Sequence, residues 1–347
     1  MPGRAHPPRI RDVASLAGVS PKTVSNVVNG TDRVSASTRA RVEQVIAELG
    51  YRPNIAARNL RRGRTGLLTL ALPDLDVPYF AELTRGIVDA AGERGYTVLI
   101  DQTNGDPGRE SYVVDGVGAR MADGVIFSPL AMDAEALSRR IQRTPMVLLG
   151  EKVPADGVGI DRLDIDHIGI DNVAAAQSAV SHLIGTGRRR VAVIGAEPSR
   201  ASATADVRIV GYRRAHSAAH RRIDPALIIP TRHFRRRDGA EAARQLLSLS
   251  QPPDAVFCCS DLLALGLLRA LHERGVRVPD DIAVVGFDDI EDGSYSIPTL
   301  STVAPDKLGI ARAAVHQLLE RIGGSTGPGR EITVGHELRI RESSRPS

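Results

Sequence analysis

The sequence predicts a small all-α head joined to an α/β body of two doubly wound parallel-sheet subdomains. Residues 10–49 read as three short helices with apolar residues at helical spacing. From residue 66 onward, strand and helix patterns alternate in two successive series. The strand cores, such as Val191-Ala192-Val193-Ile194, are continuous apolar runs, which is typical of parallel strands buried on both faces. Ligands bind such sheets beyond the carboxyl ends of the strands, so we expect a cleft between the subdomains.

Start and stop residues divide the head into its helices. Gly18 ends the first helix, and Ser20 is a natural N-cap for a second helix whose first position suits Pro21. Ser35 can cap a third helix, which Gly50 ends. Three helices in about 40 residues, the first two joined by Gly-Val-Ser, have helix-turn-helix geometry.

The body elements follow from the alternating pattern in chain order. We expect strands at residues 67–72, 97–100, 124–127, 146–149, 191–194, 227–229, 255–258 and 282–285. We expect helices at residues 79–94, 109–120, 134–142, 172–185, 208–219, 238–249 and 262–274.

The expected domains are a head, a linker and two subdomains that each draw on two parts of the chain. The head spans residues 1–50, and residues 51–65 form a hinge and linker in which the segment Ile55–Leu60 is too short to be a stable helix in isolation. The assignments for the body are residues 66–165 with 293–325 for the first subdomain, and 166–292 with 326–347 for the second.

The charge of the chain is unevenly distributed. The 347 residues hold 45 Lys and Arg against 41 Asp and Glu, a formal net charge of +4. Residues 1–65 hold 12 basic and four acidic residues, so the head carries +8 and the remainder −4. This asymmetry indicates a head that binds nucleic acid or another anionic surface.

Composition excludes several other classes. Cys258 and Cys259 are adjacent, so in a strand they point to opposite faces and a structural disulfide between them is not expected. No Cys/His cluster has zinc-ligand spacing, and we expect neither metal nor cofactor. The N-terminus lacks the apolar stretch of a signal peptide, and no run approaches a membrane span. We therefore expect a cytoplasmic, nucleoid-associated protein with no membrane partner.

Short motifs distributed in order over nearly the whole chain carry a family resemblance. They include Ala17-Gly18-Val19-Ser20, Leu49-Gly50-Tyr51-Arg52-Pro53-Asn54, Ile170-Asp171-Asn172, Gly286-Phe287-Asp288-Asp289 and Pro298-Thr299-Leu300. Together they resemble the lactose-repressor (LacI) family. The resemblance implies a periplasmic-binding-protein-like body and a sequence-specific transcriptional regulator, expected to be a repressor. Such a protein binds a palindromic operator as a homodimer, with a tetramer also open, under the control of a small molecule in the cleft.

The second head helix is the expected reader of bases. The family's specificity positions fall on Pro21, Lys22 and Asn26, at the start of that helix and one turn on. Lys22 can donate to guanine and Asn26 can pair with adenine, although Lys22 could instead be solvated or bound to phosphate. Short polar side chains near the helix starts are expected to bind phosphate oxygens, and Ser35 could also act as a simple cap. These phosphate candidates are Thr23, Ser25, Asn29, Ser35 and Thr38.

The hinge segment resembles the family's minor-groove helix. Asn54, Ala57 and Leu60 match its contact positions. Small Ala57 permits close approach, and Leu60 can act as an apolar wedge that unstacks a base step, although an isolated leucine is usually core.

The expected effector site combines residues at strand ends with positions that match the family's pocket. Arg208 and Asp288 would give opposed hydrogen-bonding groups suited to sugar hydroxyls or a polar ring, whereas Asp261 could instead cap the helix that follows it. Relatives usually have Asn where this chain has Ser260. The full set is Asp76, Tyr79, Phe80, Phe127, Ser128, Glu151, Arg208, Phe234, Ser260, Asp261 and Asp288.

Two other function classes share an α/β body of this kind. A solute-binding protein for transport would require export and would not explain the basic head. An enzyme would need catalytic motifs, but the sequence has no Gly-x-Gly-x-x-Gly after a strand, no phosphate-binding loop and no Gly-x-Ser-x-Gly elbow. We therefore expect no catalytic residues and a sugar-like effector in place of a substrate.

Overall fold

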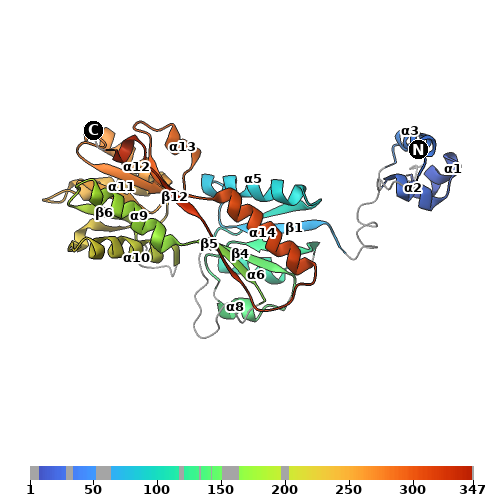
Figure 1. Cartoon of the computed structure of the whole chain (residues 1–347), viewed down its shortest axis with the longest axis horizontal. Helices are drawn as coiled ribbons and strands as arrows, with labels where there is room; N and C mark the ends of the chain where they lie inside the picture. Colours follow the sequence, from blue (N-terminus) through green and yellow to red (C-terminus); the bar gives the residue numbers. More distant parts are fainter. Residues whose placement is uncertain are drawn as a thin grey trace, which may run out of the picture. The chain divides into compact units, whose positions relative to one another are not determined.

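The computed structural model describes residues 8–28, 34–51, 64–116, 121–132, 134–141, 143–150, 164–196 and 203–345. Its contacts divide the chain into two units, a head over residues 1–65 and a body over residues 66–347. Figure 1 shows the helical head and the two-lobed α/β body.

The head is a three-helix unit around a small apolar core. Its helices are α1 (Ile10–Leu16), α2 (Pro21–Val28) and α3 (Ala36–Leu49). Each helix contributes buried apolar side chains, among them Val13, Val24 and Val42, which are all fully buried. The helical spacing of these valines explains why three helices too short for independent stability pack as one unit.

Capping fixes the helix boundaries in the head. The Ser20 hydroxyl accepts a hydrogen bond from the Thr23 amide at 3.1 Å, and the Ser35 hydroxyl accepts one from the Thr38 amide at 3.4 Å. Gly50 ends α3 with a φ of 60°, a left-handed conformation that favours glycine. The predicted caps and stop of this part of the head are thus confirmed.

The first lobe of the body is built on a fully parallel six-stranded sheet in the order β11-β5-β4-β3-β1-β2. Its strands are β1 (Leu67–Leu72), β2 (Thr97–Gln102), β3 (Gly124–Phe127), β4 (Met146–Leu149), β5 (Asp166–Ile170) and β11 (Glu331–Val334). The helices are α5 (Pro78–Gly92), α6 (Pro107–Asp115), α8 (Ala134–Ser138) and α14 (Lys307–Ile322).

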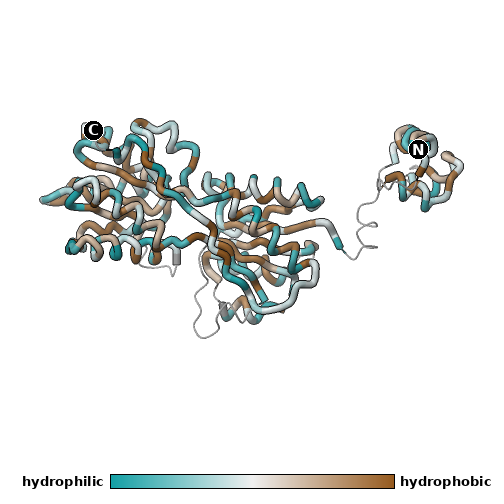
Figure 2. Tube along the Cα trace, viewed as in Figure 1, coloured by the Kyte–Doolittle hydropathy of each residue, from teal (hydrophilic) through white to brown (hydrophobic). Residues whose placement is uncertain are grey.

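Alternating side chains of this sheet supply two separate cores. In β3, Val125 and Phe127 pack in the core that includes α6 and α8, while Ile126 packs in the core with α5 and α14. All three side chains are fully buried, as expected for a parallel strand covered on both faces. Figure 2 shows the apolar strands running through the middle of each lobe, with more hydrophilic helices outside.

The second lobe has a six-stranded sheet in the order β12-β10-β9-β8-β6-β7, in which β12 alone pairs antiparallel. Its strands are β6 (Val191–Ala196), β7 (Ile228–Pro230), β8 (Ala255–Cys258), β9 (Ala283–Phe287), β10 (Ser301–Pro305) and β12 (His336–Arg339). Its longer helices are α9 (Asn172–Gly185), α10 (Ala203–Ala218), α11 (Arg236–Leu247) and α12 (Asp261–His272), with the short α13 (Glu291–Ser294) near β10. Helix α9 packs with α10, and α11 packs with α12 (Figure 1).

The chain passes between the lobes three times. It crosses from β5 to α9, from β10 to α14 and from β11 to β12. The second and third crossings lie side by side, because the Asp306 amide donates to the Gly335 carbonyl at 3.0 Å. Ile170, at the end of β5, packs against the cores of both lobes.

Strand pairing corrects the predicted subdomain boundaries. The prediction assigned residues 166–170 to the second subdomain, but β5 pairs with β4 in the first sheet. It assigned residues 293–305 to the first subdomain, but β10 pairs with β9 in the second. Residues 326–347 are divided, because β11 extends the first sheet and β12 the second. Which sheet a strand joins is decided by its long-range pairing, and the local composition of the strand does not reveal it.

Several predicted elements differ at their ends. The helix expected at 134–142 ends at Ser138, and the one expected at 109–120 ends at Asp115. Residues 225–227 form a 3₁₀ turn, so the neighbouring strand starts one residue later than predicted. The strand β5 and all elements after β9 were not predicted.

A buried ion pair fastens α14 to the first sheet. Asp166 on β5 is fully buried and accepts from Arg321 at 2.6 and 3.0 Å. The Arg330 amide also donates to Asp166 at 2.8 Å, and Arg321 donates further to the Gly327 and Pro328 carbonyls. Hydrogen bonds from these arginines hold the pKa of Asp166 below its ordinary value, against the effect of burial. The loop between α14 and β11 is thereby held against β5.

Removing this carboxylate should destabilise the body strongly. Asp166→Ala leaves the buried Arg321 without its partner, and breaking such a pair costs about 3–5 kcal/mol of unfolding free energy. Denaturant unfolding measures the loss. The control Glu241→Ala removes an exposed pair with Arg244 at 2.9 Å, and its effect should stay within about 1 kcal/mol. Equal losses in the two variants would contradict a special role for Asp166.

Candidate ligand cleft and nucleic-acid interface

A cavity of about 420 Å³ lies between the two lobes of the body. Residues that follow strands of both sheets line it, including Asp74 after β1, Ser128 after β3 and Asp288 after β9. The carboxyl ends of parallel strands therefore face one another across the cleft, as expected for ligand sites in doubly wound sheets. A cavity of this volume suits a small organic molecule.

Aromatic and apolar side chains line the cavity from both lobes. Tyr79 and Phe80, in the first turn of α5, line it with ring centroids 5.3 Å apart in an edge-to-face arrangement. Phe234 lines it from the second lobe, together with Leu262 and Ile290. Such surfaces stack against sugar or ring faces of a ligand.

Arg208 supplies the main buried positive charge. Its Nε donates to Asn172 at 2.9 Å, and its Nη1 donates to the Cys259 carbonyl. The guanidinium lies 3.5 Å from the centroid of the Phe287 ring. The remaining Nη2 lies 4.0 Å from Asp288 Oδ1. The arginine is therefore fixed by three neighbours with one edge directed at the aspartate.

The carboxyl group of Asp288 is largely removed from water. Its backbone has a φ of 114°, and its amide donates to the Val303 carbonyl at 2.9 Å. Burial raises the pKa of Asp288 to about 6, against the opposing effects of Arg208 and Lys307. The carboxyl can thus serve as a hydrogen-bond acceptor near neutral pH and as a donor below it.

An ion pair spans the cleft from one lobe to the other. Arg235, at the start of α11, pairs with Asp74 and lies 3.6 Å from Asp76. Arg235 and Asp74 both line the cavity. The side chain of Asp76 is 93% exposed and does not line the cavity, so the prediction that Asp76 belongs to the pocket is wrong. Asp76 instead contacts Arg235.

Two further predicted pocket residues lie elsewhere. Phe127 is fully buried in the core of the first lobe, because it points to the α6 and α8 side of β3. Asp261 is also fully buried, where it accepts from the Thr302 hydroxyl at 2.6 Å and the Ile290 amide at 3.0 Å. Ser260 caps α12, so the predicted capping role of Asp261 is wrong as well.

The remaining predicted pocket residues that the structure describes come together. Tyr79, Phe80, Ser128, Arg208, Phe234, Ser260 and Asp288 all line the cavity. Further polar residues that were not predicted also line the cavity, namely Asp74, Asn104, Asn172, Thr204, Arg232, His233 and Arg235. The position of Asp74 directly beyond a predicted strand is a signal that could have identified it.

In the head, the three predicted base-reading residues all lie on α2. Pro21 and Lys22 are exposed, and Asn26 lies one turn further along and is partly buried. Val24 and Val27 on the same helix are buried in the head core. The helix thus has one face committed to packing and one that presents polar side chains.

The predicted phosphate-binding side chains already take part in local hydrogen bonds. The Thr23 hydroxyl lies 2.9 Å from that of Ser20, and the Ser35 hydroxyl donates to that of Thr38 at 2.9 Å. Ser25 is partly buried on α2. A hydroxyl can donate once and accept twice, so a single local hydrogen bond does not by itself exclude a contact with phosphate.

Five predicted site residues lie outside the described part of the chain. They are Asn29, Asn54, Ala57, Leu60 and Glu151. Among the described residues, no helix is long and apolar enough to span a membrane. Within the same ranges, no group of three or more His, Cys, Asp or Glu side chains could hold a metal ion.

Comparison with known proteins extends these observations. A model of bacterial regulatory proteins of the lacI family matches residues 9–54, and one of a periplasmic binding protein-like domain matches residues 180–344. The solved lac repressor dimer bound to operator and the anti-inducer ONPF is 28% identical, with a TM-score of 0.83 over 98% of this chain and 99% of that one. The CelR–cellobiose complex is 32% identical, with a TM-score of 0.70 over 97% and 99%. A head of this kind and a small-molecule cavity in the body are features of the class of DNA-binding regulators to which these structures belong.

The sequence match assigns the family. The chain is 35% identical over 339 residues to the HTH-type transcriptional repressor CytR of Escherichia coli strain K12, covering 97% of this chain and 96% of the relative. The chain therefore belongs to the LacI family and is a DNA-binding transcriptional regulator, as its sequence motifs indicate.

The raised pKa of Asp288 makes a prediction for stability. Between about pH 4 and pH 6 the folded state keeps a proton that the unfolded state releases, so unfolding free energy falls as pH rises through this window. The loss is complete above pH 6 and amounts to about 3 kcal/mol. Urea unfolding across this range should show a steeper loss of unfolding free energy with rising pH in the wild type than in Asp288→Asn, since the other shifted carboxyls are common to both proteins. Parallel curves for the two proteins would contradict the assignment.

Proposed function

We propose that this regulator is a repressor that binds a palindromic operator as a homodimer, and that a sugar-like small molecule in the cleft controls its DNA affinity. The single observation that supports this most is the juxtaposition of Arg208 and Asp288 inside a cavity shared by both lobes. A ligand held there contacts both lobes and shifts the population between closure states. Relatives described as an operator-bound dimer and a cellobiose complex support both halves of the proposal.

The head would read the operator through α2. Lys22 and Asn26 are the base-contacting candidates, and Thr23, Ser25, Ser35 and Thr38 the phosphate-contacting ones. The hinge residues Asn54, Ala57 and Leu60 would enter the minor groove at the operator centre. A two-fold symmetric dimer requires two half-sites related by the same axis.

The cleft chemistry favours a neutral, hydroxyl-rich or polar-ring effector. Arg208 donates and Asp288 accepts, while Tyr79, Phe80 and Phe234 offer apolar ring faces. Ser260 contributes a hydroxyl to the cavity, where an asparagine would offer a bidentate amide. Its small side chain leaves room for a substituent on the ligand.

We further propose that the protein does not turn over its ligand and that it acts in the cytoplasm, where its operator would lie. Its relatives are regulators, which supports a binding role for the cleft. Incubating purified protein with candidate sugars tests this, and measurable product formation would contradict it.

The effector site can be tested by thermal shift with a panel of sugars and nucleosides. A compound that binds only the folded wild type raises its Tm, by the equivalent of about 2.7 kcal/mol at 100 times Kd. Asp288→Asn should lose the shift because it replaces the charged carboxylate facing Arg208 with a neutral amide that has one acceptor oxygen in place of two. Asp292→Asn, an exposed aspartate paired with Arg236, should keep it. Retention of the full shift in Asp288→Asn would exclude that carboxylate from the site.

The head can be tested with an operator obtained by in vitro selection. Lys22→Ala should weaken binding to the selected duplex by about 1–3 kcal/mol if Lys22 contacts a base. Binding to random duplex of equal length should change less, and Arg269→Ala in the body should change neither. Equal losses on both duplexes would assign Lys22 to a phosphate instead.

A further inference from the structure

Two consecutive aspartates after β9 adopt left-handed backbone conformations. Asp288 has a φ of 114° and Asp289 a φ of 50°, although neither is glycine. Such conformations are unfavourable and persist only where surrounding contacts hold them, often at functional sites. The contacts that hold this turn therefore identify residues on which the geometry of Asp288 depends.

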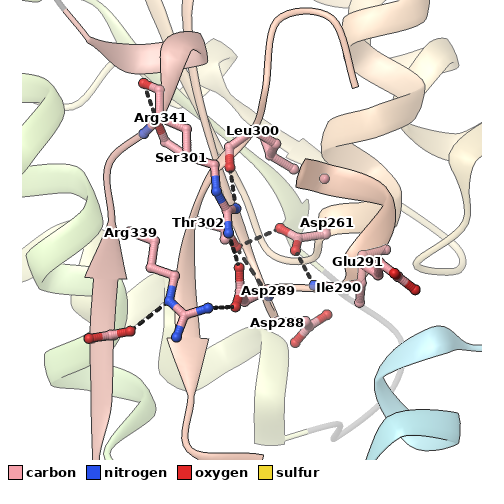
Figure 3. Close-up of polar contacts among 12 residues, drawn as sticks. Asp261, Asp288, Asp289, Ile290, Glu291, Leu300, Ser301, Thr302, Arg339 and Arg341 are labelled. Carbon is pink, nitrogen blue, oxygen red and sulfur yellow. Dashed lines mark hydrogen bonds and ion pairs between the residues drawn. The ribbon is translucent and has the colours of Figure 1, made fainter. Parts of the chain in front are cut away.

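The Asp289 carboxylate is clamped by two arginines from the C-terminal segment. Arg339 on β12 donates to one carboxylate oxygen, and Arg341 donates to the other at 2.7 Å. Arg341 is itself anchored, since it donates to the Leu300 carbonyl at 2.7 Å and its amide donates to the Ser301 hydroxyl at 2.8 Å. Figure 3 shows both guanidinium groups converging on Asp289, while Asp288 points away from them.

The same turn is held from the other crossing segment. Lys307 is the first residue of α14, one residue beyond the crossing at Asp306, and donates to the carbonyls of Asp288 and Asp289 at 2.9 and 2.8 Å. Its ammonium group also pairs with Glu82 on α5. Arg339 lies four residues beyond the crossing at Gly335. Both returning segments thus hold the one turn that presents Asp288 to the cleft.

We propose that Asp289 is a positioning residue, whose ion pairs with Arg339 and Arg341 hold Asp288 in its strained turn and link that turn to the crossing strand β12. The proposal rests on the proposed effector role of Asp288. It assigns to Asp289 no contact with the effector. Movement of one lobe relative to the other would pull on β12 and, through the clamp, on the turn.

The pKa of Asp288 depends on its surroundings and can therefore report whether the Asp289 clamp is intact. The charges that act on its ionisation are Arg208 from α10, Lys307 from α14 and Glu82 from α5. Burial and, after it, the Asp288 carboxylate raise the pKa of Asp261 on α12, and burial and Asp288 also raise that of Cys259 against the effect of Arg208. Burial is the largest influence and raises the pKa of Asp288 to about 6. If the clamp is released, the turn opens to water and this pKa should fall. Loss of a positive charge alone would instead raise it.

The experiment uses effector-free full-length protein labelled at aspartate carboxyl carbons and titrated by NMR, with the Asp288 signal assigned by its loss in Asp288→Asn. In Arg339→Gln and Arg341→Gln the titration midpoint of Asp288 should fall by about one pH unit. Arg339 is 49% exposed, so its variant should fold normally. Asp289→Glu keeps the charge and should restore part of the wild-type midpoint, relative to Asp289→Asn.

Arg236→Gln is the matched control, because Arg236 pairs at 2.9 Å with Asp292, three residues beyond the clamp. It should leave the Asp288 midpoint unchanged. Hydrogen exchange of residues 286–292 and 331–341 should accelerate in Arg341→Gln and not in the control. A midpoint that stays or rises in both arginine variants, or exchange that accelerates in neither segment, would overturn the proposal. Because no ligand is present, this outcome is independent of whether Asp288 binds an effector.

Discussion

The threefold crossing of the chain between the lobes is the constraint on which the body depends. Each crossing joins elements of different lobes, since β5 of the first lobe leads into α9 of the second, β10 of the second leads into α14 of the first, and β11 of the first continues into β12 of the second. The connections are short, and two of them are hydrogen-bonded to each other through Asp306 and Gly335. Because residues of both lobes line the cavity, its shape depends on the relative orientation of the lobes.

The cleft is preorganised by the cost of burying charge. A buried guanidinium must be satisfied, and Arg208 is held by Asn172, the Cys259 carbonyl and the face of Phe287. Its last edge faces Asp288, whose carboxyl is desolvated in turn. A ligand that bridges these two groups replaces water with partners already in place, which lowers the ordering cost of binding.

Sequence patterns predicted the elements whose burial is uniform. Residues 124–127, 146–149 and 255–258 were assigned correctly because strands covered on both faces are continuous apolar runs. The strand β5 escaped this rule because Asp166 and His167 interrupt it. Those side chains are tolerated there only because Arg321 and the Gly150 carbonyl, both distant in sequence, supply their partners. The lobe to which each C-terminal strand belongs depends on such long-range pairing, which local composition does not encode.

Local sequence also does not predict which of two neighbouring residues lines the cavity. Ser260 and Asp261 are neighbours, yet Ser260 caps α12 and lines the cavity while Asp261 turns into the core, where Gly286 leaves it room. A Cβ at Gly286 would lie 2.1 Å from Asp261 Oδ1, so the buried carboxyl and the glycine require each other. Asp288 and Asp289 divide in the same way, one toward the cleft and one toward β12. In these adjacent acidic residues, backbone direction decides which carboxylate faces the cleft and which one pairs with the arginine of β12.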